Sequence, residues 1–259
     1  MESPSPFASD ASWRRQLRAR VSTWWRVKMV SNMLGMAAFF VAYFWVLHHP
    51  RFPITVMPLT PFDQWVPFEP AAMALYVSLW LYVSLPLALL KNPRELVSFG
   101  VATLALSATG LAIFLAYPTA VPGFDIDWSR YPSVAFLKAV DVGDNACPSL
   151  HVAFAVFTGV WLERLLREMN VGWPVRVLNA AWCAGILYST LATRQHVALD
   201  VLAGASLGLF VVALQLRGLD LGHARAQPRA VEVIGTAAGS VRRASGMPAA
   251  TTSPDPAAR

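Results

Sequence analysis

Long apolar runs without a charged residue alternate with short polar segments along most of the chain. Runs long enough to cross a hydrocarbon core of roughly 30 Å occur at residues 29–50, 70–90 and 96–124. Shorter runs follow at 145–162, 177–193 and 201–216. The last run is short for a span, so we extend it back to include His196 and Asp200. The pattern predicts an all-α, polytopic membrane protein built as a bundle of six transmembrane helices.

Composition agrees with this reading and divides the chain into three parts. Hydrophobic residues make up 56% of the sequence and charged residues 14%, against about 25% charged in an average soluble domain. Residues 1–28 set Trp13, Leu17, Val21 and Trp24 at helical spacing among arginines, which predicts a basic amphipathic segment on the inner leaflet. Residues 29–216 form the membrane domain. Residues 217–259 hold few large apolar side chains, and we expect a disordered tail.

The net charge of +6 follows membrane topology and does not indicate a nucleic-acid partner. With both termini in the cytoplasm, the inner segments 1–28, 91–95, 163–176 and 217–259 hold 6, 2, 3 and 6 of the 21 Lys and Arg residues. Basic residues concentrate on the cytoplasmic side of membrane proteins. The distribution predicts an inner (cell) membrane protein with cytoplasmic termini, and it leaves the oligomeric state open. The partner implied is the lipid bilayer.

Cysteines and histidines give no sign of a metal centre. The two cysteines, Cys147 and Cys183, lie in or next to predicted spans and suit packing positions. No Cys/His spacing is typical of a zinc site. We therefore expect no metal and no other cofactor.

The segment Ser189–Asp200 places three ionisable groups at the mouth of an apolar span. His196 and Asp200 are four residues apart, so on a helix they share one face, and the carboxylate can accept the imidazole Nδ1 proton. Nε2 would then point outward as a base or nucleophile. Arg194 cannot share that face and is expected in a loop or first turn, where its guanidinium could hold an oxyanion. The alternative is a polar pair that only stabilises a helix bundle.

A second histidine follows the longest predicted outer loop, about residues 118–147. The loop ends in Gly-Asp-Asn-Ala-Cys-Pro-Ser-Leu-His, and Pro148 suits the first turn of a helix that contains His151. Spans four and six run in the same direction, so His151 and His196 should open on the same outer face. Two helix N-termini would converge there and favour a phosphate. One histidine could attack phosphorus while the other protonates the leaving oxygen.

At these residues the chain resembles the type 2 phosphatidic acid phosphatase/haloperoxidase superfamily. Pro148-Ser149-Leu150-His151 is similar to the family's Pro-Ser-Gly-His motif, and His196 with Asp200 is similar to its His-x-x-x-Asp motif. The resemblance implies a lipid phosphatase or phosphotransferase, acting on a phospholipid or lipid phosphate at the outer ends of helices 4 and 6. By this resemblance, His196 would be the nucleophile that forms a phosphohistidine, and Asp200 would orient it. His151 would be the acid that protonates the leaving alcohol and then the base that activates the acceptor. Ser149 and nearby amides would contact phosphate oxygens.

Three departures from the family pattern point to one of its branches. Ser189 and Thr190 stand where the family has Ser-Arg, Leu150 replaces the glycine, and the Lys-x6-Arg-Pro motif is absent. Together with Asn145 and the string Thr-Arg-Gln-His, these features look more like the inositol phosphorylceramide synthase branch, which transfers a phospho-headgroup between lipids. Phosphate charge would then be met by Arg194, by Asn145, by helpers such as Lys138 or Arg130, and by helix dipoles.

The sequence also leaves alternatives to a lipid phosphotransferase open. The enzyme could be a plain lipid-phosphate phosphohydrolase. An intramembrane His/Asp pair also suits a proton-coupled transporter, but we find no internal repeat, and the ionisable groups gather at one membrane face. An inactive homologue is disfavoured because both histidines and the aspartate are present, and a nucleophilic Ser149 lacks an evident third partner.

Overall fold

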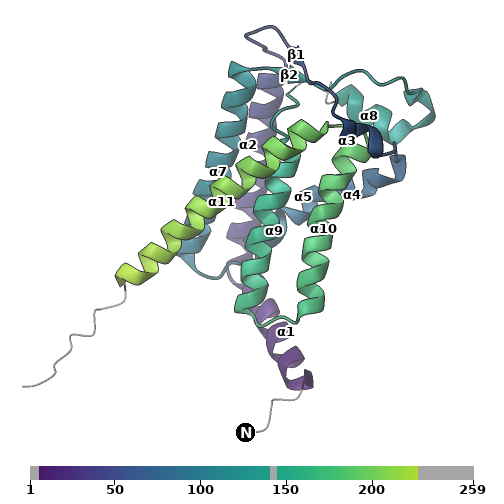
Figure 1. Cartoon of the computed structure of the whole chain (residues 1–259). Coiled ribbons are helices and arrows are strands. Elements are labelled where there is room, and N and C mark those ends of the chain that lie inside the picture. Colours follow the sequence, from purple (N-terminus) through teal and green to yellow (C-terminus); the bar gives the residue numbers. More distant parts are fainter. Residues whose placement is uncertain (1–5, 141–144, 227–259) are drawn as a thin grey trace, which may run out of the picture.

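The computed structural model describes residues 6–140 and 145–226 as a bundle of helices (Figure 1). Its long helices are α1 (Pro6–Ser22), α2 (Trp25–Leu47), α7 (Pro93–Ala116), α9 (Leu150–Glu168), α10 (Trp173–Ala192) and α11 (Ala198–Ala226). The shorter ones are α3 (Pro61–Trp65), η1 (Pro70–Ala72), α4 (Met73–Val77), α5 (Leu79–Tyr82), α6 (Ser84–Leu89), η2 (Trp128–Arg130) and α8 (Pro132–Val140). Strands β1 (Thr55–Val56) and β2 (Thr119–Ala120) pair in parallel.

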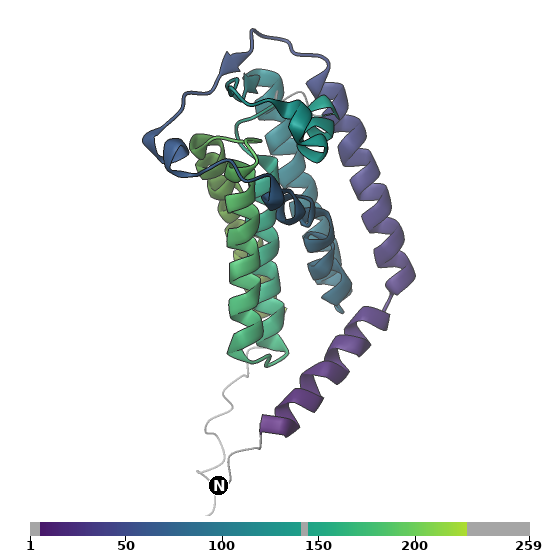
Figure 2. The same cartoon turned by 90° about the vertical axis from the view of Figure 1, so that its right-hand side faces the viewer.

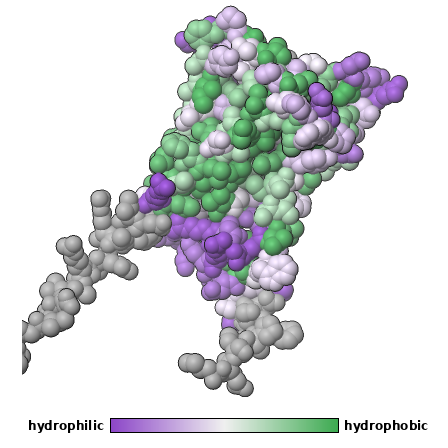
Figure 3. All heavy atoms as spheres, in the orientation of Figure 1, coloured by the Kyte–Doolittle hydropathy of each residue, from purple (hydrophilic) through white to green (hydrophobic). Residues whose placement is uncertain are grey.

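The two ends of the bundle differ in character. One end carries β1, β2, α3 and α8, and we call it the loop end; the opposite end carries α1, and we call it the α1 end (Figures 1 and 2). Between them lies an apolar belt, with hydrophilic residues gathered toward both ends (Figure 3). This is the surface expected of a protein whose middle faces lipid.

Five helical stretches in the described part of the chain are long and apolar enough to cross a membrane. They are Trp25–Leu47, Pro70–Leu89, Pro93–Ala116, Trp173–Ala192 and Ala198–Leu219. The prediction of a helical membrane protein is therefore supported. Helix α9 occupies the place of the predicted fourth span, but its last two turns carry four charged residues, and it is not one of the five. The count of six spans stays a prediction.

The last helix is longer than the sequence pattern indicates. Helix α11 continues to Ala226, beyond the predicted end of the span at residue 216. The segment 217–226, which we assigned to the disordered tail, is therefore helical. The remainder of that predicted tail, 227–259, lies outside the described residues.

The stretch Pro70–Leu89 is interrupted at Ser78 and Val83, which separate α4, α5 and α6. Pro86 contributes to the second break, because a proline ring cannot donate to the carbonyl four residues earlier and crowds it. At the first break the Ser78 hydroxyl donates to the Leu75 carbonyl at 2.6 Å and accepts from the Trp182 indole at 3.1 Å. Such back-bonding by serine bends a helix. The broken stretch passes beside the start of α9.

Helices α9 and α11 pack closely through two glycines. A Cβ placed on Gly204 would collide with the backbone carbonyl of Ser149, and one on Gly208 with that of Ala153. Small residues four apart let helix backbones approach each other in membranes. Because α9 contributes the fully buried Val152, Trp161 and Leu165 to the core, this seam fixes the start of α11 beside the start of α9.

At the α1 end, ion pairs join three helices. Arg20 of α1 pairs with Glu168 of α9 at 3.2 Å, and Arg164 of α9 pairs with Glu95 of α7 at 3.6 Å. Trp13 and Leu17 of α1 pack on the main core. Residues 6–22 thus form a helix that contacts the bundle through Trp13 and Leu17, while the amphipathic role of segment 1–28 on the inner leaflet stays a prediction.

Candidate active site

The start of α9 is built by Ser149. Its Oγ accepts the Val152 N–H at 3.2 Å as an N-cap, and its own N–H donates to the Asp200 carbonyl at 3.0 Å. Serine is a preferred N-cap because it satisfies an amide that has no partner within the helix. Ser149 is fully buried. It therefore ties the first turn of α9, and with it His151, to the first turn of α11.

His196 lies in the turn between α10 and α11. The Thr190 carbonyl accepts both the Gln195 N–H at 3.0 Å and the His196 N–H at 3.1 Å. Arg194 has a φ of 58°, in the left-handed region. Since α11 begins at Ala198, His196 precedes the helix. The expectation that His196 and Asp200 share one helical face is wrong: the left-handed turn ends α10 and delays the start of α11.

Asp200 is nevertheless close to His196. Its Oδ2 accepts the Val197 N–H at 3.0 Å and lies 3.5 Å from His196 Nδ1. The Asp200 side chain is fully buried, whereas the His196 ring is 12% exposed. Asp200 Oδ1 and His196 Nδ1 have no hydrogen-bond partner among the described residues. Catalytic hydrogen bonds that are long in a free enzyme often tighten when substrate binds. The carboxylate faces Nδ1, so Nε2 is the nitrogen available to a ligand.

His151 is held in place by Tyr76, which belongs to the interrupted stretch Pro70–Leu89. Its Nε2 lies 2.9 Å from the Tyr76 carbonyl oxygen. A carbonyl can only accept, so Nε2 carries the hydrogen in this arrangement and Nδ1 is free to exchange a proton with a ligand. The imidazole also stacks on the Tyr76 ring, with centroids 3.8 Å apart and planes 13° apart. Both contacts fix the orientation of the ring.

His151, His196 and Asn145 line the same cavity, which has a volume of about 760 Å³. Asn145 adopts a φ of 61°, is buried, and has no hydrogen-bond partner for its Nδ2 among the described residues. A buried amide without a partner costs free energy. A ligand oxygen in the cavity would satisfy it. His151 and His196, which were predicted to open on the same face, thus line one cavity together with Asn145.

The predicted cationic residues are placed differently. Arg194 donates from Nη1 to the Asp63 carbonyl at 3.0 Å and from Nη2 to the Val66 carbonyl at 2.8 Å. Lys138 Nζ donates to the Arg194 carbonyl at 3.1 Å and lies over the Trp128 ring. Both side chains therefore organise the loop end in this conformation. Arg130 is exposed and pairs with Asp127 at 3.1 Å, so it is not brought to the histidines.

Two contributors were not found from the sequence. Asp63 Oδ1 accepts the Ala198 N–H at 2.7 Å, at the start of α11, and Oδ2 accepts from Thr60. The capping-box spacing of Thr60 and Asp63 was a readable signal for the local turn, but not for the distant contact. The Tyr76 carbonyl left no signal, because any residue type offers a backbone oxygen.

Groups of three or more His, Cys, Asp and Glu side chains with a geometry suited to a metal ion do not occur within residues 6–140 and 145–226.

Comparison with known proteins gives one result. The model of the PAP2 superfamily matches residues 94–220, a range that contains His151, His196 and Asp200. This match supports a phosphatase-type activity on lipid phosphates. Neither the curated proteins nor the solved structures include a match to this chain.

Proposed function

We propose that this chain is a membrane enzyme of the PAP2 superfamily that removes or transfers the phosphoryl group of a lipid through a phosphohistidine. The observation that carries the proposal is the shared cavity: His151, His196 and the unpartnered Asn145 amide line it together. The match to the PAP2 superfamily over residues 94–220 adds independent support.

In the first step, His196 Nε2 attacks phosphorus and the bond from phosphorus to the lipid oxygen breaks. His151 gives a proton to that oxygen, so the lipid leaves as an alcohol. Asp200 stabilises the positive charge on the phosphorylated imidazole, because its carboxylate lies 3.5 Å from Nδ1. In the second step, His151 takes a proton from the acceptor, whose oxygen attacks phosphorus and releases His196.

The phosphate oxygens need donors in both steps. The Asn145 amide is one candidate, and the first amides of α9 form another, because helix N-termini favour anions. Ser149 contributes by holding that helix start in place. Arg194 and Lys138 would act on phosphate only after releasing loop carbonyls, and in the present conformation they add positive charge at the loop end.

The acceptor is the finer part of the proposal. We propose that the phosphohistidine transfers its group to an alcohol, such as a lipid hydroxyl, in preference to water. Transfer of an inositol-phosphate-type headgroup would be one form of this reaction. A transferase must keep water from the phosphohistidine. Packed aromatic rings of the loop end support this: Phe68 lies 5.7 Å from Trp128 and 5.0 Å from Tyr131, and Arg194 lies 5.0 Å from the Phe124 ring.

Single-turnover chemistry tests the histidine roles. His196→Ala should abolish phosphoenzyme formation. His151→Ala should slow turnover of a lipid phosphate by about 10²–10⁴-fold, yet it should still be phosphorylated by an aryl phosphate, whose leaving group needs no proton. Phosphoenzyme should then accumulate, because the base for the second step is missing. Full activity of His196→Ala, or no phosphoenzyme in any variant, would contradict the mechanism.

The acceptor is tested with labelled phospholipid in mixed micelles, with and without ceramide, diacylglycerol or inositol. Transfer predicts a new labelled product that depends on the added alcohol. Labelled inorganic phosphate or a free phospho-headgroup as the sole product, unchanged by any alcohol, would leave a plain phosphohydrolase. Addition of a chelator should leave the rate unchanged, since protein groups supply the positive charge.

A further inference from the structure

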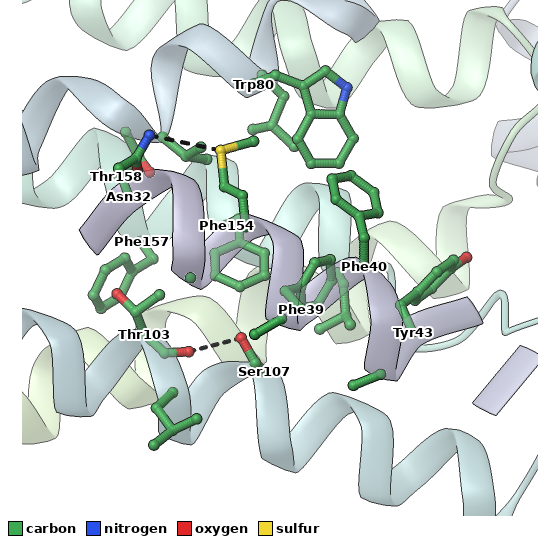
Figure 4. Close-up of a pocket in the computed structure, with 18 of the residues that line it drawn as sticks. Asn32, Phe39, Phe40, Tyr43, Trp80, Thr103, Ser107, Phe154, Phe157 and Thr158 are labelled. Carbon is green, nitrogen blue, oxygen red and sulfur yellow. Dashed lines mark hydrogen bonds between the residues drawn. The ribbon is translucent and has the colours of Figure 1, made fainter. Parts of the chain in front are cut away.

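The cavity that contains the two histidines extends far beyond them. From His151 and His196 it continues between α2 on one side and α4–α7 and α9 on the other. At the α1 end it is lined by Val27, Leu87 and Leu96. Figure 4 shows Phe39 of α2 beside Phe154 of α9 and Phe40 of α2 beside Trp80 of α5, with ring centroids 5.7 and 4.9 Å apart. The cavity is therefore a long channel with the histidines at one end.

The channel walls are mostly apolar beyond the histidines. None of its lining residues is Asp, Glu, Lys or Arg. Three of its polar side chains away from the histidines are engaged by the protein: Thr103 and Ser107 donate to carbonyls of their own helix at 2.8 and 2.9 Å, and Asn32 donates to Ser84 Oγ at 3.0 Å. Figure 4 shows the bond of Ser107 and a second contact of Asn32, to the Met36 sulfur. A ligand portion lying there finds apolar contacts, which suits hydrocarbon.

The channel is deep enough for a lipid chain. On α7, Gly110 faces Leu150, the neighbour of His151. Gly100, which lines the channel, lies ten residues closer to the α1 end than Gly110, or about 15 Å along the helix at 1.5 Å per residue. Half of a bilayer's hydrocarbon core is also about 15 Å. A chain whose phosphate end sits at the histidines would reach Gly100 after crossing one leaflet.

We propose that this channel holds one hydrocarbon chain of the lipid substrate and sets the longest chain that the enzyme accepts. The proposal rests on the proposed function, since it places the phosphate at His151 and His196. Gly35 of α2 and Gly100 of α7 determine the free length. Both line the channel, both are exposed, and a Cβ at either position would meet no atom within 4 Å, so a leucine fits at this wall without a clash and can narrow the channel.

The experiment compares Gly100→Leu and Gly35→Leu with Gly218→Leu as a matched control. Gly218 is an exposed helical glycine outside the channel, with nothing within 4 Å of its Cβ position. Lipid phosphates are supplied with chains from much shorter than half of the hydrocarbon core to longer than it. Gly100→Leu and Gly35→Leu should lose about tenfold or more in kcat/KM for the longest chains and keep wild-type rates for the shortest, while the control keeps the wild-type profile.

Binding measured without turnover separates this proposal from the proposed function. A long-chain phosphonate, which cannot be cleaved as an ester, should bind the two channel variants at least about tenfold more weakly than it binds the control, even if no variant turns over any lipid phosphate. Equal losses for short and long chains, unchanged binding, or the same effect in Gly218→Leu would overturn the channel. Activity on short chains that survives such a result would leave the proposed function in place.

Discussion

Asp63 joins the first loop of the loop end to the turn that carries His196. One carboxylate oxygen accepts the Ala198 N–H, and the residue's carbonyl accepts from Arg194. The side-chain hydrogen bonds of Asp63 go to Thr60 and to the Ala198 amide, so we expect Asp63 to act as a positioning residue. Asp63→Ala should cost about 1 kcal/mol of stability, as loss of a cap does, and should lower kcat more than it raises KM. Asp63→Asn keeps an acceptor oxygen and should restore most of kcat.

Thermal unfolding and steady-state kinetics on the same two variants check this role. A purely structural Asp63 would lower the unfolding temperature without changing kcat of the folded fraction. Equal kinetics of Asp63→Ala and wild type at a temperature where both are folded would therefore contradict the positioning role.

Leu150, the departure from the family's glycine, is matched by a glycine elsewhere. A Cβ on Gly110 of α7 would collide with the Leu150 side chain, so Gly110 opens the space that Leu150 fills. Gly110→Ala should destabilise the protein by about 1–3 kcal/mol through overpacking. The pair Gly110→Ala with Leu150→Ala should recover most of this loss, as measured by denaturation in detergent. Additive losses in the double variant would contradict the pairing.

At the residue scale, the chemical roles of the site residues stay predictions, while the positions of their side chains can be compared with the sequence reading. The sequence placed His151, His196 and Asp200 in one site, because two motifs at the starts of parallel helices must meet. It also assigned Arg194 and Lys138 to phosphate, whereas their side chains reach loop carbonyls. Arg194 has a left-handed backbone conformation, and its side chain bonds carbonyls of a loop some 130 residues earlier in the chain. The spacing of residues along the sequence cannot reveal such contacts.

At the scale of helices, the seam between α9 and α11 aligns the two halves of the site. Gly204 touches the backbone of Ser149, whose N–H is bonded to Asp200. Gly204→Ala should push α11 away from α9, with a stability loss of about 1–3 kcal/mol and a clear fall in activity. Gly218→Ala, in an open part of the same helix, should be neutral or slightly stabilising. Equal stability and activity of the two variants would show that the seam does not matter.

The positions of most helices could be predicted from the sequence, because apolar runs bounded by Pro and Asn residues indicate where helices begin and end. The predicted first span, within the run 29–50, corresponds to Trp25–Leu47, and the second at 70–90 to Pro70–Leu89. The breaks within the second stretch were not predicted, because they depend partly on Ser78 bonding to Trp182 of α10. The start of α11 was missed for a similar reason: Asp200 and Asp63 bond to Val197 and Ala198 amides and define the helix end in three dimensions.

At the scale of the whole molecule, the distribution of basic residues predicts on which side of the membrane the site lies. The α1 end carries the basic residues of α1 and the ion pairs of Arg20 and Arg164, and the histidines lie toward the opposite end. Basic segments stay in the cytoplasm. We therefore expect the α1 end inside the cell and the site on the periplasmic or extracytoplasmic side, with the acceptor drawn from that side.

Cysteine labelling decides this orientation. In a background without Cys147 and Cys183, single cysteines replace exposed residues at each end: Thr55 or Ser133 at the loop end, and Gly172 between α9 and α10. An impermeant maleimide should label Thr55→Cys and Ser133→Cys in intact cells, because water reaches the loop end from outside. It should label Gly172→Cys only after the membrane is opened. The reverse pattern would put the histidines in the cytoplasm, and the acceptor would then come from the cytoplasmic leaflet.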